Sequence, residues 1–288
     1  MSSRHYGPLH GIWAIANREL VKWYKVPFII GMSLVQPILW LALFGKAMNL
    51  GNLFTSSSLQ IPGLNIPSQV MDELGRDIML KVFGVTDYFS FLAAGMLSFI
   101  VLFMSMNSGM TIVWDRRLGI LNKLLTTPVP RSNIVMGKSL ASVVKSLVQA
   151  TVVLLVAVLL GMQFRTGLNP LDFLGTYAVL FLLSMGLSSL FLMLALRSTS
   201  WESQMMIMNL VNMPLLFTSN SFYPLQMMPW WLRSVAMVNP ITYSNEAIRG
   251  LLLGTPGVNL YLDFAYLVAF AALFTGLLAL MARRMLSR

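Results

Sequence analysis

The sequence contains no cysteine, which excludes disulfide bonds and thiolate metal sites. It has only two histidines, His5 and His10, and both precede the first apolar run, so a histidine metal site or an intramembrane histidine relay is also excluded. Charged residues make up only 10% of the chain, whereas a soluble domain carries about 25%. So few charges cannot cover a surface that faces water, and we expect lipid to be the main solvent around this chain.

Apolar residues are abundant instead: they make up 57% of the 288 residues, and the mean hydropathy is +0.73. A helix that crosses the hydrocarbon core of a bilayer needs about 20 apolar residues. Such segments must be helical, because lipid offers no partner for free backbone groups. We therefore predict an all-α membrane protein with six transmembrane helices, at about Val26–Phe44, Tyr88–Val113, Ile134–Leu160, Phe173–Leu196, Met205–Phe222 and Tyr261–Met281.

The basic residues indicate how the chain lies in the membrane. The formal net charge is +10, but the lysines and arginines gather at the ends of the apolar runs, which indicates topology rather than nucleic-acid binding. We predict a multi-pass protein of the plasma membrane, with both termini cytoplasmic and the first segment retained rather than cleaved. With that orientation, fourteen of the 20 lysines and arginines lie inside, and the six outside are Lys46, Arg76, Lys81, Arg165, Arg233 and Arg249.

Residues 8–25 predict an amphipathic helix that lies on the cytoplasmic membrane surface. An ordinary basic flank of the first span is the alternative. On a helix, an apolar face is formed by Trp13, Ala16, Leu20, Trp23 and Tyr24, and the opposite face by Arg18, Lys22 and Lys25.

Segment 223–255 is too apolar for a free loop and too interrupted for a full span. It contains the pair Trp230–Trp231, then Pro240 and the stretch ITYSNEAIRGLLLG. Tryptophan favours the membrane interface, so we predict a re-entrant segment of short helices on the extracellular side. A hairpin at the interface without a function is the alternative.

The sequence shows no catalytic cluster and no cofactor or metal site. Gly137-Lys138-Ser139 is similar to the end of a phosphate-binding loop, but the required earlier glycine is replaced by Ser132. Lys145 is the main ionisable candidate for a function within a span. We predict that it lies near the inner end of its helix and extends its ammonium group toward the cytoplasm.

Asparagines interrupt two predicted spans: Asn107 lies in the second, and Asn209 and Asn212 lie in the fifth. Such side chains in lipid should face other helices or a cavity. Interhelical hydrogen bonds and the lining of a substrate path therefore both remain open.

Residues 114–131, WDRRLGILNKLLTTPVPR, form the only strongly basic loop between two long apolar runs. We predict a short amphipathic helix between Arg116 and Thr127, capped by Asp115 and ended by Pro128 and Pro130. An apolar stripe on such a loop must bury itself on lipid or on a partner protein. The stripe consists of Leu118, Leu121 and Leu125, broadened by Ile120 and Leu124.

This loop resembles the cytoplasmic signature of type 2 permeases of ATP-binding-cassette (ABC) exporters. The matching residues are Asp115, Arg116, Arg117, Leu118, Gly119, Ile120, Leu121, Leu124, Leu125, Pro128, Val129 and Arg131. A second similarity is the stretch Asn239-Pro240-Ile241-Thr242-Tyr243 with Arg249 after it. With the span number and the re-entrant segment, the resemblance covers nearly the whole chain. It departs from the family pattern in the threonine-rich tract Leu-Thr-Thr-Pro and in the long loop after the first span.

The resemblance implies a permease subunit that is not itself an enzyme. It implies a homodimer with two copies of a separate ATPase, which binds ATP and Mg. The substrate cannot be read from the sequence, and an apolar, weakly charged interior suits a lipophilic drug, a lipid or a lipid-linked glycan alike. The implied ATPase contacts, on a coupling helix, are Asp115, Arg116, Arg117, Leu118, Gly119, Leu121, Leu124, Leu125, Pro128 and Arg131. The second and fifth spans would line the dimer axis, with a substrate path at Asn107, Asn209, Asn212 and Phe217. Segment 223–255 would form an extracellular gate at Trp230, Trp231, Asn239 and Pro240.

Two other classes remain. An ion- or proton-coupled secondary transporter would work without an ATPase, and the shortage of acidic residues in the spans counts against it. A membrane-embedded enzyme acting on lipid would need a catalytic cluster, which the sequence lacks.

Overall fold

The computed structural model describes residues 8–47, 68–127, 129–198 and 200–285, and no β-strand occurs among them. The predicted all-α class is confirmed for this part of the chain. The elements are α1 (Pro8–Tyr24), α2 (Pro27–Trp40), the π-helical turn η1 (Leu41–Ala47), α4 (Ser68–Phe83), α5 (Tyr88–Arg117), α6 (Ile120–Leu125), α7 (Arg131–Leu159), α8 (Pro170–Arg197), α9 (Trp201–Phe217), the 3-10 turn η2 (Leu225–Met227), α10 (Trp230–Ala236), α11 (Pro240–Leu253) and α12 (Leu260–Met285).

Four described helical stretches are long and apolar enough to cross a membrane, namely Gly75–Arg117, Arg131–Leu159, Pro170–Arg197 and Leu260–Arg284. The predicted first span falls on α2 and η1, where the apolar stretch Ile30–Leu43 is shorter. The predicted fifth span falls on α9, which has 17 residues and ends at Phe217 rather than Phe222. Pro214 removes the hydrogen bond from its position to the carbonyl of Leu210, and the helix ends one turn later, where Thr218 begins a tight turn. The six-span count stays a prediction.

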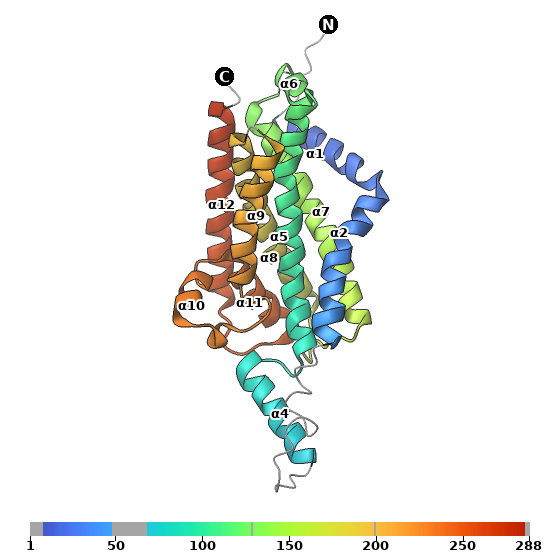
Figure 1. Ribbon diagram of the computed structural model, residues 1–288, viewed down its shortest axis with the longest axis vertical. Coiled ribbons are helices and arrows are strands. Elements are labelled where there is room, and N and C mark those ends of the chain that lie inside the picture. Colours follow the sequence, from blue (N-terminus) through green and yellow to red (C-terminus); the bar gives the residue numbers. More distant parts are fainter. Residues whose placement is uncertain (1–7, 48–67, 128, 199, 286–288) are drawn as a thin grey trace.

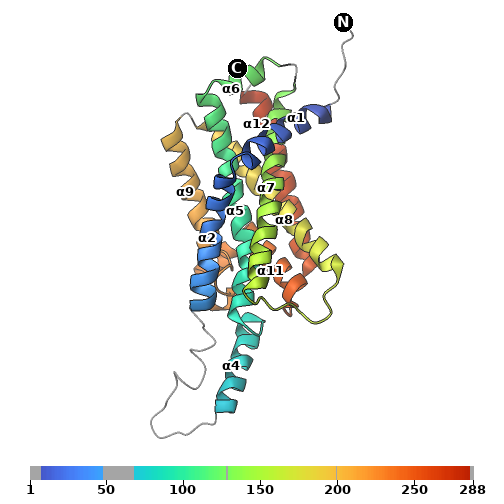
Figure 2. The same cartoon turned by 90° about the vertical axis from the view of Figure 1, so that its right-hand side faces the viewer.

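The long helices α5, α7, α8 and α12 run side by side, and α5 lies at the centre of the bundle (Figure 1). Helices α2 and α9 flank α5, while α1 crosses one end of the bundle obliquely and packs on α7 (Figures 1 and 2). The start of α1, the end of α12 and α6 lie at the same end of the molecule, and α4, α10 and α11 lie toward the other.

Small polar side chains hold the centre of the bundle together. The hydroxyl of Ser188 on α8 donates to Ser142 on α7 at 2.8 Å and contacts Ser105 on α5 at 3.2 Å. Gly109 lets α5 approach α8 closely, because a Cβ there would lie 2.7 Å from the carbonyl oxygen of Phe191. Small residues of this kind let helix backbones pack tightly in lipid.

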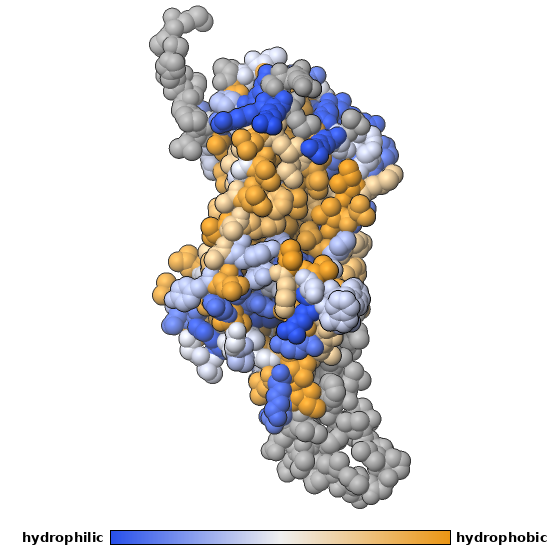
Figure 3. Space-filling model, turned by 90° about the vertical axis from the view of Figure 1, so that its left-hand side faces the viewer, coloured by the Kyte–Doolittle hydropathy of each residue, from blue (hydrophilic) through white to orange (hydrophobic). Residues whose placement is uncertain are grey.

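The surface has the polarity expected of a membrane protein. Figure 3 shows an apolar belt around the middle of one face, with hydrophilic residues gathered at the end that carries α6. This distribution and the apolar helices place the protein in a membrane.

Candidate functional site

The basic loop folds into the end of α5, a turn at Gly119 and the short helix α6. Gly119 has a φ of +68°, where a residue with a Cβ would be strained by roughly 1–2 kcal/mol. The prediction of one helix from Arg116 to Thr127 is therefore wrong, because the chain breaks at this glycine. Asp115 does not cap that helix either, since it lies inside α5 and Gly119 stands at the N-cap of α6.

Helix α6 buries one side of its predicted leucine stripe. Leu121 is 4% exposed and belongs to an apolar cluster with Ile15 of α1, on which Leu124 and Leu125 also pack. Leu118, on the turn, is 63% exposed. The stripe thus holds α6 on the bundle, and the surface left open at this end is formed by Arg117, Leu118, Asn122, Lys123, Thr126 and Thr127. Of the remaining predicted contacts, Arg131 begins α7 half-buried and Pro128 lies outside the described residues.

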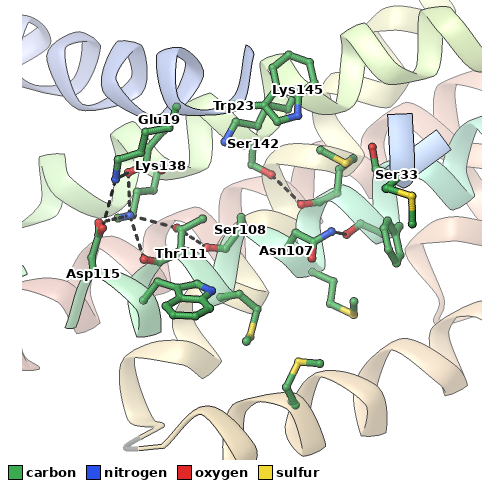
Figure 4. A pocket seen from close by; sticks show the side chains of 18 of the residues that line it. Glu19, Trp23, Ser33, Asn107, Ser108, Thr111, Asp115, Lys138, Ser142 and Lys145 are labelled. Carbon is green, nitrogen blue, oxygen red and sulfur yellow. Dashed lines mark hydrogen bonds and ion pairs between the residues drawn. The ribbon is translucent and has the colours of Figure 1, made fainter. Parts of the chain in front are cut away.

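Five charged side chains from three helices form a connected network beside α6. Lys138 of α7 lies 2.6 Å from Asp115 of α5 and 3.1 Å from Glu19 of α1. Arg18 lies 2.6 Å from each of these two carboxylates, and Lys22 lies 3.5 Å from Asp115. Figure 4 shows the carboxylates of Glu19 and Asp115 converging on Lys138. We call these five residues the charge clamp.

The charge clamp is buried at its centre. Lys138 is 2%, Asp115 3% and Glu19 4% exposed, and Lys138 also donates to the Thr111 hydroxyl at 3.1 Å. Burial alone acts to raise the pKa of Glu19, but Lys138, Arg18 and Lys22 outweigh burial and lower it to about 2. Glu19 is therefore ionised at neutral pH, and α1, α5 and α7 are joined by compensated charges. Removing one member of such a buried group costs about 3–5 kcal/mol.

Arg116 connects the same end of α5 to α8. Its guanidinium donates to the carbonyl oxygens of Ser198 and Leu196, the latter at 3.2 Å, where α8 ends. A cation at the C-terminus of a helix is favoured by the unpaired carbonyl groups there. Asp115 and Arg116, both predicted to contact an ATPase, are thus bound to residues of their own chain.

A cavity of about 780 Å³ extends from the charge clamp toward the middle of the bundle. Figure 4 shows the clamp at one end of it and Ser33 and Asn107 at the other. Its walls come from α1, α2, α5, α7 and α9, and they are mostly apolar, with five methionines and five aromatic residues. We call it the α1–α9 cavity.

The structure separates the residues predicted for a substrate path. Asn107 lines the α1–α9 cavity and donates to the carbonyl of Phe103 on its own helix. Asn209 is exposed on α9, Phe217 is 51% exposed, and Asn212 buries an Oδ1 that has no hydrogen-bond partner. The last three do not line this cavity, so they remain predictions for a path elsewhere.

At the opposite end, α11 is held by buried polar contacts. Arg249 is 3% exposed and donates to the carbonyl oxygens of Phe91 at 3.1 Å, Asn220 at 2.8 Å and Ser221 at 3.1 Å. Its guanidinium also lies 3.4 Å from the centroid of the Phe91 ring. The start of α5 is thereby fixed to α11 and to the turn after α9.

The four residues predicted for the gate lie at this end in two different settings. Asn239 is buried, caps α11 by accepting from the backbone N–H of Ile241, and donates to the carbonyl of Leu215 at 2.7 Å. Pro240 begins α11, also buried. Trp230 and Trp231 on α10 are 82% and 56% exposed.

Several functional contacts were missed from the sequence. Lys138 was considered only as part of a nucleotide motif, and Glu19 was not singled out. The sequence did contain a signal for this network: Lys138 lies within a predicted span, and an ionisable residue within a span needs a partner of opposite charge on a neighbouring helix. Lys145 lies fourteen residues from each end of α7, so the prediction that it lies near the inner helix end is wrong. No cluster of three or more His, Cys, Asp or Glu that could hold a metal occurs in the described part of the chain.

Comparison with known proteins identifies the family of this chain. The chain is 29% identical over 242 residues to the putative transport permease ycf38 of Cyanophora paradoxa, covering 83% of this chain and 73% of that protein. The ycf38 protein of Porphyra purpurea is 27% identical over 251 residues, covering 87% and 76%. The daunorubicin resistance ABC transporter permease protein DrrB1 of Streptomyces coeruleorubidus is 27% identical over 171 residues, covering 59% and 60%. The ABC-2 type transporter family matches residues 10–253, and the chain therefore belongs to this family as a type 2 ABC permease subunit.

Proposed function

We propose that this chain is the membrane-spanning subunit of an ATP-driven exporter and that α6 transmits force from a separate ATPase. The observation that carries the proposal is the position of α6: its polar side is open, and its apolar side packs on a bundle in which the charge clamp joins α1, α5 and α7. An exposed surface that is connected to the helices behind it can transmit a movement of a bound partner to those helices. ATP and Mg act on the partner, and this chain supplies the path.

The contact surface for the ATPase consists of the open residues around Gly119, foremost Arg117, Leu118 and Lys123. Asp115, Arg116 and Leu121 serve by holding this surface in place, since their side chains are bound within the chain. Leu124, Leu125, Pro128 and Arg131 complete the loop. When the ATPase pair closes on ATP, α6 moves and carries the end of α5 with it.

Helix α5 carries this movement across the membrane. Its 30 residues span about 45 Å, and its far end is fixed to α11 through Arg249 and Phe91. Segment 223–255 is then a re-entrant gate, in which the buried Asn239 and Pro240 hold α11 and the exposed Trp230 and Trp231 lie at the membrane interface.

The orientation follows from the same proposal. The end with α6 faces the cytoplasm, so both termini are cytoplasmic and α10 and α11 are extracellular, in a plasma membrane that the chain crosses six times. Helix α1 lies at the cytoplasmic interface, with Trp13 and Tyr24 more than half exposed toward lipid.

The working unit is a homodimer joined along α9. Four large apolar side chains, spaced as one helical stripe, are exposed on this helix: Met206, Leu210, Met213 and Phe217. Asn209 is exposed beside them, and an asparagine is costly against lipid. A second copy would cover the stripe and place Asn209, Asn212 and Phe217 near the shared axis. A lipophilic cargo fits the drug-resistance function named for the relative DrrB1.

The test is capture of the ATPase by the full chain carrying an affinity tag, purified in mild detergent. We expect a protein with ATPase activity to co-purify and transport to require ATP. Leu118→Asp should abolish capture without lowering thermal stability, because Leu118 has an open side chain. The matched control is Leu80→Asp on α4, whose side chain is 46% exposed. Transport sustained by an ion gradient without any ATPase would refute the proposal and favour a secondary transporter.

A further inference from the structure

The α1–α9 cavity contains a positive charge that no residue in the described part of the chain neutralises. Lys145 points into the cavity from the middle of α7, and no hydrogen bond or ion pair joins it to any described residue. The acidic residues that line the cavity, Glu19 and Asp115, are already bound by Lys138 and Arg18. An ammonium group held among apolar side chains without an anion is costly.

A second polar group faces the same space without a partner. The indole Nε1–H of Trp23, which also lines the cavity, is buried and makes no hydrogen bond. Figure 4 shows Trp23 and Lys145 together, next to Ser142 and away from the ion pairs of the clamp. Both free groups are donors, so the ligand they favour is an acceptor with negative charge.

The remaining walls favour an apolar body. Methionines from three helices line the cavity, among them Met32 of α2, Met104 of α5 and Met205 of α9, and flexible thioethers adapt to ligands of different shapes. Its volume of about 780 Å³ lies within the range of about 300–1,000 Å³ typical of small-molecule sites.

We infer that the α1–α9 cavity binds an anionic amphiphile: one carboxylate or phosphate group at Lys145 and Trp23, and an alkyl or aromatic body among the methionines. That a ligand binds is inferred from the residues that line the cavity. Only the statement that this ligand is cargo on its way to export rests on the proposed function. Lys145 is a binding residue here, and the charge clamp closes the cavity at one end without taking part in anion binding.

Binding is measured with the purified full chain in nanodiscs of phosphatidylcholine, without ATPase or ATP. The probe is 11-(dansylamino)undecanoate, detected by energy transfer from tryptophan, with empty nanodiscs as the blank. Dodecyl phosphate and dodecyltrimethylammonium serve as competitors of equal chain length and opposite charge. We expect dodecyl phosphate to displace the probe and the cationic competitor to fail over the same concentration range.

The variants test the charge of Lys145 and the space in the cavity separately. Lys145→Met should weaken binding of the probe by about tenfold or more, the loss expected for one charge-assisted hydrogen bond. Lys145→Arg, which keeps the charge, should bind within about threefold of the parent. Met32→Trp should also weaken binding, because it fills the cavity from a side chain that is 56% exposed. For this variant the affinity is taken from the midpoint of the titration, because the added tryptophan changes the amplitude of the energy transfer. The control is Lys81→Met, an exposed lysine on α4.

Equal affinity in Lys145→Met and the parent, or displacement by the cation as efficient as by dodecyl phosphate, would overturn the inference. Lys145→Met removes an unpaired ammonium, so we expect its thermal stability to equal or exceed that of the parent, and a weaker signal cannot be attributed to unfolding. Adding phosphatidylglycerol to the nanodiscs distinguishes a membrane lipid from a dissolved ligand. If phosphatidylglycerol displaces the probe, the site binds a lipid. If phosphatidylglycerol does not displace the probe, the site binds a solute. Because no ATPase is present, binding can succeed or fail independently of coupling.

Discussion

Lys138→Met tests whether the charge clamp holds together the end of the bundle that carries α6. Methionine keeps the length of the side chain and removes its charge and its donors. Lys138 loses ion pairs of 2.6 Å to Asp115 and 3.1 Å to Glu19, together with its hydrogen bond to Thr111. The two carboxylates then stay buried with only the partly exposed Arg18 and Lys22 beside them. We expect a loss of about 3–5 kcal/mol in the free energy of unfolding.

The assay is unfolding of the purified chain in detergent, followed by circular dichroism and by tryptophan fluorescence. Lys81→Met removes an exposed lysine of α4 and should change stability by less than about 0.5 kcal/mol. Asp115→Leu alone should also destabilise strongly, because it leaves Lys138 with a single carboxylate. The double variant should be more stable than the sum of the two losses predicts, since neither buried partner is then left unpaired.

Two results would refute this reasoning. If Lys138→Met unfolds like Lys81→Met, the network does not stabilise the bundle. If the losses of Lys138→Met and Asp115→Leu add without coupling, the two side chains do not interact in the protein, whatever each contributes alone.

Three further predictions concern single residues. Gly119→Ala should be strained by roughly 1 kcal/mol and should reduce transport-coupled ATP hydrolysis. The control Gly167→Ala, also at positive φ and with nothing near its Cβ position, should show the strain without the loss of hydrolysis. Equal hydrolysis in both variants would contradict a special role of the α5–α6 turn. Arg249→Lys should lower stability by about 2 kcal/mol, because the single nitrogen of an ammonium cannot reach all three carbonyl groups that Arg249 contacts through its two terminal guanidinium nitrogens. The exposed Arg76→Lys should match the parent in thermal unfolding. The pKa of Glu19 is lowered to about 2. The ionised Glu19 therefore stabilises the fold by about 3 kcal/mol above pH 4.5, and this stabilisation is lost as the pH falls toward 2. Glu19→Gln should flatten this part of the stability–pH curve.

The fold class could be predicted from composition and hydropathy, because lipid as solvent leaves few alternatives for an apolar chain. The predicted spans at Tyr88–Val113 and Phe173–Leu196 lie within α5 and α8. Helix ends were less predictable. Hydropathy alone continued the fifth span to Phe222, whereas Pro214 and the polar turn after it end α9 at Phe217.

The contacts of the candidate site could not be predicted. The role of the basic loop as the contact surface stays a prediction, and a helical pattern does not show which leucines pack inside the fold: Leu121 is buried within the chain. Asp115 looked like a cap because it precedes a predicted helix, while its partners lie 97 and 23 residues away in sequence, at Arg18 and Lys138. Pairing over such distances depends on which helices pack together, and the periodicity of apolar residues in a sequence does not reveal this.

The contacts of α5 explain why one helix can serve as the connection between the two ends of this protein. Its last turn is fixed to α1 and α7 by the charge clamp and to α8 by Arg116. Its first turn is fixed to α11 through Arg249, and serines hold its middle. Helix α9 has an exposed apolar stripe and an unpaired Asn212, so its outer face has fewer ties to the bundle. If α6 transmits force as proposed, a push on α6 should move α5 with its attached helices as one body. Relative motion should then be easiest at α9, where a second copy would meet the first.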